Sequence, residues 1–149
     1  MRWVLRILAG LFWFILGMLF ASAAAADRQL NCLAQAVYWE ARGQPFNSQI
    51  AVAQVVLNRV EDGRFPTTIC GVVYQRTAKG CQFEWVCAGL RRARDQRAWH
   101  MALHIAEVAT TDYIDLVDGA IFFHDTRVRR WPHLERTARI GDLIFYKEP

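Results

Sequence analysis

Glu40 interrupts an apolar helical face in the segment AVYWEARGQPF. At about 100° per residue, it falls near the centre of the arc formed by Leu33, Ala36 and Val37. It also lies in the last turn of the helix, where the exposed carbonyl groups disfavour a negative charge. Burial and this dipole both raise the pKa of a carboxyl group. A carboxyl that stays protonated near neutral pH can serve as a general acid, so the pattern predicts that Glu40 is catalytic.

A structural role for Glu40 is the alternative. It would require a buried cation beside the carboxylate, and Arg42 and Arg59 are the candidates. Glu40 would then stay ionised and could not donate a proton. Because buried ion pairs contribute little to stability, such a pair explains the placement less well than catalysis does.

Two amide side chains, Gln54 and Asn58, interrupt a second apolar segment, QIAVAQVVLNRV. They are four residues apart and therefore share one helical face. Buried amides need hydrogen-bond partners. Neighbouring backbone groups can supply them, or the two amides can edge the same cleft as Glu40 and bind substrate. The sequence leaves both interpretations open.

The segment GCQFEWVCAG places Gln82, Phe83 and Trp85 between two cysteines. A loop closed by a disulfide can hold aromatic rings rigidly at a surface, where their faces stack on sugar rings. An amide beside them can bind sugar hydroxyls. These three residues are therefore predicted to bind substrate, and the alternative is that the rings fill part of the core.

The four cysteines, Cys32, Cys70, Cys81 and Cys87, all follow an N-terminal segment that resembles a secretory leader. An even number of cysteines in an exported chain indicates two disulfides. Their spacing does not fit the two-residue separations typical of zinc sites, and no metal or other cofactor is expected. Of the three possible pairings we favour Cys81–Cys87 as a local loop closure, which leaves Cys32–Cys70.

Two helices are predicted to position the first of these residues. Residues 28–42 are expected to form a helix that ends at Gly43. A second helix, capped by Asn47 or Ser48, is expected to run to about Val60. This second helix is apolar almost all round, as a central, buried helix should be.

The second half of the chain is predicted to be mixed. Residues 71–93 are expected to be irregular, and Asp95 is expected to cap a helix that runs to about Thr111. The segments GAIFFH and IGDLIFY are predicted to be two short strands that can pair. The fold class is therefore α+β, a mainly helical domain with a small sheet at its C-terminal end.

The chain of 149 residues is long enough for one domain. Arg2 and Arg6 flank its start, and the twenty residues that follow carry no charge. This pattern predicts a signal peptide over residues 1–26, cleaved after Ala26, with a retained membrane anchor as the alternative. The domain then covers residues 27–149, and the protein is expected in the periplasm or cell envelope.

Residues 27–149 carry a net charge of +2 when histidine is counted as neutral. Such mild basicity does not indicate nucleic-acid binding, and no nucleic-acid partner is expected. A membrane partner is expected only if the leader is retained. The sequence leaves the oligomeric state open.

The ordered segments CLAQAVYWEARGQPFNSQIAVAQVVLNRV, RFPTTICGVVYQ and CQFEWVCAG resemble the SleB-type cell wall hydrolase family, which includes spore-cortex-lytic enzymes. The resemblance implies a lysozyme- or transglycosylase-like fold. It also implies peptidoglycan as the partner, cut between N-acetylmuramic acid and N-acetylglucosamine. The family's catalytic glutamate lies in an E-A-R-G motif, which matches Glu40 and the three residues after it.

The segment AIFFHDTRVRRW resembles the family's histidine-containing region near the C-terminus, and there His124 is predicted to bind substrate. Two positions depart from the family pattern. Phe122 stands where relatives often have histidine, and Leu143 stands at the histidine position of I-G-x-H-x-F-Y. A metal site or a histidine-assisted step is therefore not carried over from relatives, whereas Glu40 is unaffected.

The reaction type depends on how many carboxylates act. Glycoside cleavage needs a proton for the leaving oxygen and stabilisation of an oxocarbenium-like centre. Hydrolysis usually needs a second carboxylate, and Glu61 and Glu84 are candidates without an obvious motif. A single acid can instead act next as a base on the muramoyl C6 hydroxyl, which gives a 1,6-anhydro product. The missing partner favours a lytic transglycosylase.

Two rival functions belong to other classes. A zinc-dependent amidase or peptidase is suggested by His100 and His104, which have the spacing of two zinc ligands on a helix. Met101, however, stands where a zincin has its glutamate base. A non-catalytic murein-binding envelope module would keep the cleft without turnover.

Overall fold

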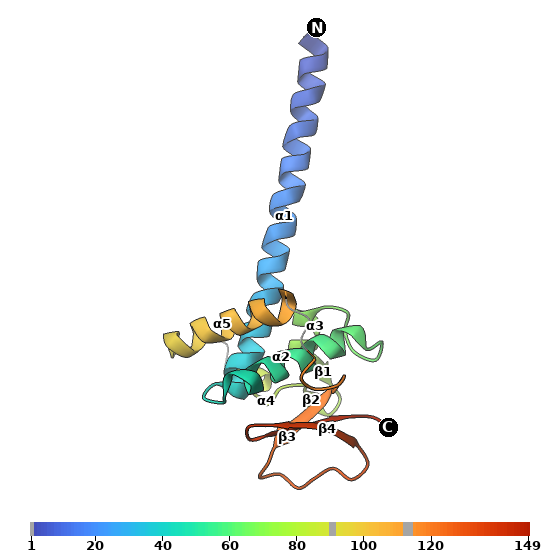
Figure 1. The fold of residues 1–149 in the computed structure, drawn as a ribbon. Helices are drawn as coiled ribbons and strands as arrows, with labels where there is room; N and C mark the ends of the chain where they lie inside the picture. The colour runs from blue at the N-terminus through green and yellow to red at the C-terminus, as the bar shows by residue number, and fades with distance from the viewer. Residues whose placement is uncertain (1, 90–91, 112–114) are drawn as a thin grey trace.

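The computed structural model describes residues 2–89, 92–111 and 115–149, with the backbone alone for residues 2–21. Its first element, α1 (Arg2–Ala41), is one helix whose N-terminal part projects from the rest of the molecule (Figure 1). The helix predicted from residue 28 is the last part of this longer one, because the alanine-rich residues before it favour helix. No helix among the described residues is long and apolar enough to cross a membrane.

α1 ends as predicted, but the next helix begins earlier than predicted. Gly43 adopts a left-handed φ of 86°, and α2 (Phe46–Glu61) follows it. The N-cap of α2 is Pro45, whose carbonyl accepts from the backbone N–H of Ser48 at 2.9 Å. The predicted cap at Asn47 or Ser48 is wrong because the Ser48 hydroxyl donates instead to the carbonyl of Ile140, at 3.1 Å.

Short elements lie in or overlap the segment 71–93 that was predicted to be irregular, of which residues 90 and 91 are outside the described residues. They are α3 (Ile69–Val73), β1 (Arg76–Thr77), β2 (Gly80–Cys81) and α4 (Glu84–Cys87). Both predicted disulfides are confirmed. Cys32–Cys70 joins α1 to α3, and Cys81–Cys87 closes the loop between β2 and the end of α4.

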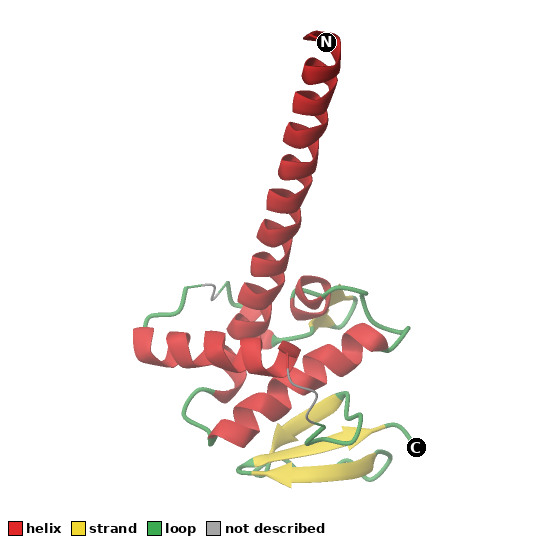
Figure 2. Cartoon of the chain, turned by 45° about the horizontal axis from the view of Figure 1, so that its top comes forward, coloured by secondary structure: helices red, strands yellow, loops and turns green. Residues whose placement is uncertain are grey.

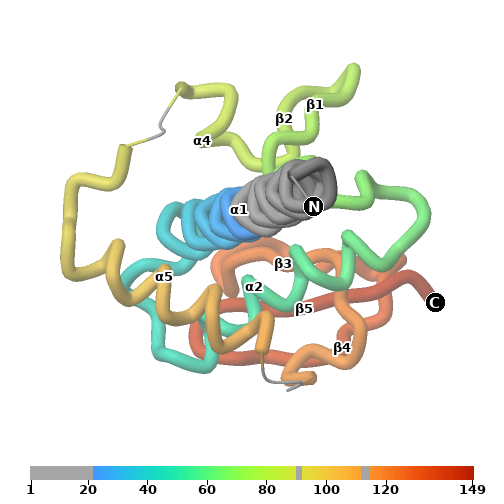
Figure 3. The backbone as a smooth tube through the Cα atoms, turned by 90° about the horizontal axis from the view of Figure 1, so that it is seen from above, coloured from blue at the N-terminus to red at the C-terminus, as the bar shows by residue number. Residues whose placement is uncertain are grey.

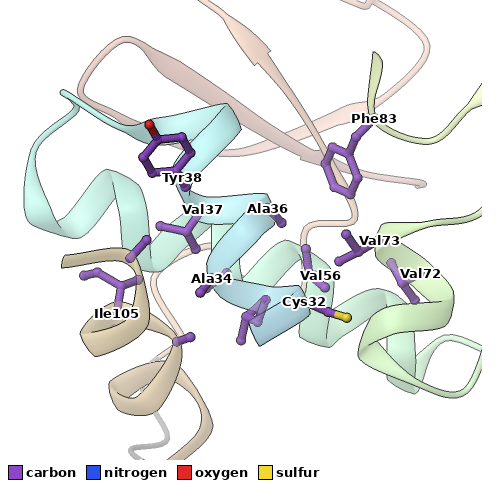
Figure 4. Packing of buried hydrophobic residues seen from close by; sticks show 14 of the residues in the cluster. Cys32, Ala34, Ala36, Val37, Tyr38, Val56, Val72, Val73, Phe83 and Ile105 are labelled. Carbon is purple, nitrogen blue, oxygen red and sulfur yellow. The ribbon is translucent and has the colours of Figure 1, made fainter. Parts of the chain in front are cut away.

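The helices share one apolar core around the C-terminal third of α1. α5 (Gln96–Thr111) begins as predicted, with Asp95 accepting a hydrogen bond from the backbone N–H of Ala98 at 3.0 Å. The core packs side chains of α1, α2, α3 and α5 together with Phe83 (Figure 4). Seen from above, α2 and α5 lie on one side of α1, and α4, β1 and β2 lie on the other (Figure 3).

A three-stranded antiparallel sheet packs against α2, on the side away from the N-terminus (Figure 2). Its strand order is β3 (Phe122–Asp125), β5 (Leu143–Lys147), β4 (Glu135–Ile140). The predicted pairing of two C-terminal strands is confirmed by the β3–β5 register. β4 was not predicted from the sequence, because this edge strand is polar, has no buried residue and lacks an apolar alternation. The α+β class is confirmed.

Candidate active site

A cleft of about 300 Å³ contains the Glu40 side chain. Its walls come from segments distant in sequence: the end of α1, α2, the β2–α4 loop with the start of α4, β3, and the connection from β3 to β4. The lining residues are Glu40, Arg59, Gln82, Phe83, Glu84, Phe122, Phe123 and Trp131. The cleft therefore combines one partly buried carboxyl, one buried cation and several aromatic rings.

Glu40 lies one residue before the end of α1 and is partly buried, as its helical position predicts. Burial raises its pKa to about 7, and the negative charge of Glu84 adds to the rise. The Trp85 indole N–H and the Arg59 charge oppose the rise. The Trp85 Nε1 has no hydrogen-bond partner within 3.5 Å among the described residues. A carboxyl with this pKa carries a proton in about half of the molecules at neutral pH.

Arg59 is the cation of the cleft, and only 4% of it is exposed. Its Nε donates to the carbonyl oxygen of Ile121 at 2.7 Å, and its Nη1 has no partner among the described residues. Burial lowers its pKa to about 10, so it remains charged at neutral pH.

No ion pair joins Glu40 to an arginine within 4.0 Å in the part of the chain that the structure describes. The Arg42 guanidinium lies instead over the rings of Tyr38 and Trp39. The geometry therefore argues against the interpretation of Glu40 as half of a structural ion pair. The sequence did not indicate that Arg59 lines the same cleft as Glu40. It suggested Arg59 only as a possible partner of Glu40 in a structural ion pair.

The β2–α4 loop brings Gln82 and Phe83 to the cleft, but it does not present its rings at a surface. Phe83 is 4% exposed and Trp85 6%. Trp85 stacks between Phe83 and Trp39, with centroid distances of 6.2 Å on each side. The expectation of surface rings is therefore wrong, because both rings fill the core. Phe83 still forms part of the cleft wall.

Gln54 and Asn58 are not brought together with Glu40. The Gln54 side-chain oxygen accepts from the backbone N–H of Leu116 at 2.9 Å, and Asn58 donates to the carbonyl of Ala120 at 2.9 Å. Both line a different hollow, together with Glu61. The backbone interpretation of these amides fits the structure, because both hold the segment that leads into β3.

His124 lies behind the cleft wall and is buried. Its Nδ1 is 2.8 Å from the Asp125 carbonyl oxygen, which can only accept, so Nδ1 carries the proton. Nε2 then accepts from the Tyr146 hydroxyl at 3.0 Å. The ring contacts Trp131 edge-on at 4.6 Å and so supports a side chain that lines the cleft. No local pattern in the sequence marked Trp131.

The positions that depart from the family pattern have different surroundings. Phe122 lines the Glu40 cleft, and Leu143 is buried in the core between α2 and the sheet. Within the described residues, no three histidine, cysteine, aspartate or glutamate side chains gather as metal ligands would. His100 and His104 are both exposed on α5.

Comparison with known proteins identifies relatives that match up to 82% of the chain. The sequence model of a family described as Cell Wall Hydrolase matches residues 43–146, a range that begins after Glu40. The spore cortex-lytic enzyme of Bacillus cereus is 43% identical over 131 residues, which are 82% of this chain and 45% of that protein. That of Bacillus subtilis is 43% identical over 53 residues, 36% of this chain and 17% of the relative. The chain thus spans less than half the length of these curated relatives.

Solved structures of similar fold include the catalytic domain of the Bacillus cereus SleB protein. It has a TM-score of 0.63 and 27% identity, and the match covers 81% of this chain and 91% of that one. The catalytic domain of the germination-specific lytic transglycosylase SleB from Bacillus anthracis has a TM-score of 0.63 and 29% identity, with coverages of 80% and 93%. The predicted resemblance to the SleB-type family is confirmed.

Proposed function

Because the chain belongs to the cell wall hydrolase family, we propose that it cleaves the glycan strand of peptidoglycan between N-acetylmuramic acid and N-acetylglucosamine. Glu40 is the general acid that protonates the leaving oxygen. The observation that carries this proposal is a carboxyl with a pKa raised to about 7 in a cleft walled by aromatic rings. Such a group can both donate and accept a proton near neutral pH.

Arg59 favours the proton transfer from Glu40. After the transfer, Glu40 is a carboxylate in a partly buried site, and the charge of Arg59 stabilises it. Arg59 itself is held by its bond to the Ile121 carbonyl, so it does not follow the substrate. Its effect is therefore already present before the substrate binds.

We infer that the reaction is that of a lytic transglycosylase. In this route Glu40 returns as a base and takes the proton of the muramoyl C6 hydroxyl, whose oxygen closes the 1,6-anhydro ring. No water is consumed and no second carboxylate is required. Hydrolysis is the second candidate because Glu84 also lines the cleft, although its side chain is exposed.

The aromatic walls are suited to sugar rings. Trp131 is partly exposed in the cleft, and His124 and Tyr146 pack against it at 4.6 and 5.5 Å. We assign Trp131 as a stacking surface for one sugar, with Phe83 on the wall and Gln82 as an amide partner for hydroxyl or acetamido groups. His124 acts on the substrate only through Trp131.

The protein would act outside the cytoplasm. Two disulfides and the uncharged N-terminal segment support export through a signal peptide over residues 1–26. Peptidoglycan in the periplasm or cell envelope is then accessible to the cleft.

Mass spectrometry of the products from purified sacculi tests this proposal. A lytic transglycosylase releases fragments that end in 1,6-anhydro-muramic acid, lighter by one water molecule than hydrolysis products. Fragments with a reducing end would favour hydrolysis with Glu84 as second carboxylate. Intact glycan strands after prolonged incubation would favour the non-catalytic murein-binding module.

A further inference from the structure

A second cleft, of about 760 Å³, lies beside the last turn of α1 and is lined by three arginines. Arg42 follows α1, whereas Arg92 and Arg94 precede α5. None of the described lining residues is acidic. In the described part of the chain, no carboxylate forms an ion pair with any of the three. The cleft therefore has the charge of an anion-binding site.

Contacts with Tyr38 hold this cleft in shape. The Tyr38 hydroxyl oxygen accepts from the backbone N–H groups of Asp95 at 3.1 Å and Arg94 at 3.2 Å, which fixes the basic segment to α1. The Arg42 guanidinium lies 4.8 Å from the Tyr38 ring centroid and 5.0 Å from that of Trp39. Backbone groups and rings thus form the frame, and the guanidinium groups stay available to a ligand.

A row of stacked rings connects this cleft with the Glu40 cleft. Trp39 lines the arginine cleft and stacks on Trp85, and Trp85 stacks on Phe83, which lines the Glu40 cleft. Each of the two steps between ring centroids is 6.2 Å. The Trp39 and Phe83 ring centroids are therefore at most about 12 Å apart, a length that an extended peptide of three or four residues covers.

We propose that the arginine cleft binds the carboxylate groups of the peptide stems attached to the glycan strand. This inference rests on the proposed glycan-cleaving function. Peptide stems branch from N-acetylmuramic acid, beside the bond that Glu40 would protonate. Guanidinium groups bind carboxylates through two parallel hydrogen bonds, a geometry that neutral amides cannot reproduce. The cleft therefore selects glycan strands whose stems carry free carboxylates.

The test compares wild type with Arg92→Gln/Arg94→Gln, in which two exposed side chains lose their charge. Three substrates are used: glycan strands with intact stems, strands with chemically amidated stem carboxylates, and strands whose stems have been removed. Wild type should have its lowest KM on intact strands. The double variant should raise that KM about tenfold, towards the amidated value, while kcat stays near wild type. Arg76→Gln/Lys79→Gln removes the same charge from the exposed β1–β2 hairpin and should keep the wild-type preference.

Equal KM values of wild type for intact and amidated strands would overturn the assignment. So would an equal loss in the hairpin control, which would show general attraction to charge. Failure of wild type to cleave any of the three substrates would contradict the proposed function instead. Equilibrium binding of soluble stem-bearing and amidated fragments then tests separately whether the arginine cleft binds stem carboxylates. Tighter binding of the free carboxylates that depends on Arg92 and Arg94 would still support this assignment, and equal binding of the two fragments would overturn it.

Discussion

Burial shifts the pKa values of Glu40 and Arg59 in opposite directions, with different effects on their ionisation at neutral pH. Burial raises the pKa of Glu40 to about 7, whereas it lowers that of Arg59 to about 10. At neutral pH the arginine is therefore charged while the carboxyl is only partly ionised. A fixed cation beside a carboxyl that exchanges its proton is what an acid that later becomes a base requires.

The pH dependence of activity should follow Glu40. Since a general acid must start protonated, kcat/KM is expected to fall as pH rises through about 7. The charge of Glu84 helps to raise this pKa, so Glu84→Gln should move the fall to lower pH. Activity of this variant at pH 6 should stay within about threefold of wild type. Measured pH profiles of cleavage on soluble glycan fragments check both expectations.

Glu61→Gln is the matched control, because Glu61 is exposed and lines the other hollow with Gln54 and Asn58. It should leave the profile unchanged. A loss of about a hundredfold or more in Glu84→Gln at every pH would instead identify Glu84 as a second catalytic carboxylate.

At the scale of elements, the sequence predicted helices and strands from local patterns. It did not predict which residues distant in sequence come into contact. The buried arc of α1 placed Glu40 correctly because helical periodicity depends on neighbours along the chain. Arg59 and Trp131 reach the Glu40 cleft only through packing of α2 and the sheet, which no local pattern encodes. The sequence did not predict β4, because its exposed arginines break the alternation of apolar and polar residues that marks a strand.

The two disulfides should differ in what their removal costs. Cys32–Cys70 closes a separation of 38 residues and Cys81–Cys87 one of 6. In the chain-entropy view, replacing the first pair by serine should cost about 4 kcal/mol of unfolding free energy, and the second about 2 kcal/mol. Denaturant unfolding of wild type and of the two double-serine variants measures these losses of unfolding free energy.

Activity should show the reverse order. Cys81–Cys87 holds the loop that supplies Gln82 and Phe83 to the cleft, so its removal should lower kcat/KM more in the molecules that remain folded. Equal activity of the two folded double variants would contradict this role of the loop.

In the whole molecule, the Glu40 cleft is formed jointly by the helices and by the sheet side. Helices α1 and α2 supply Glu40 and Arg59, and the sheet side adds Phe122, Phe123 and Trp131. The projecting part of α1 takes no part in this arrangement. Residues 22–28 are exposed, and the fully packed part of the helix begins at Cys32.

The mature protein is therefore expected to begin at Asp27, after cleavage behind Ala26. Loss of residues 1–26 should leave the core intact, because the residues just before Asp27 are exposed. Intact-mass measurement of protein from the envelope fraction checks the start. A mass that includes Met1 would favour a retained anchor.

Glu40→Gln is the substitution that tests the catalytic role of Glu40 most directly. The variant should fold and cleave glycan strands at least about a hundredfold more slowly, since general acid catalysis contributes about 10²–10⁴-fold. Its stability should hold or rise. Burial raises the pKa of Glu40 above its ordinary value of 4.5, so ionisation weakens the wild-type fold as pH rises from about 4.5 to 7. The variant lacks this penalty. Its free energy of unfolding should therefore equal that of wild type at pH 4 and exceed it by up to about 3 kcal/mol above pH 7.

Turnover on purified sacculi and thermal unfolding should be measured on the same preparations of wild type and Glu40→Gln. We expect a folded variant, at least as stable as wild type at pH 8, that has lost at least about 99% of its activity. A variant that is stable and retains full cleavage activity would contradict the assignment of Glu40 as the acid.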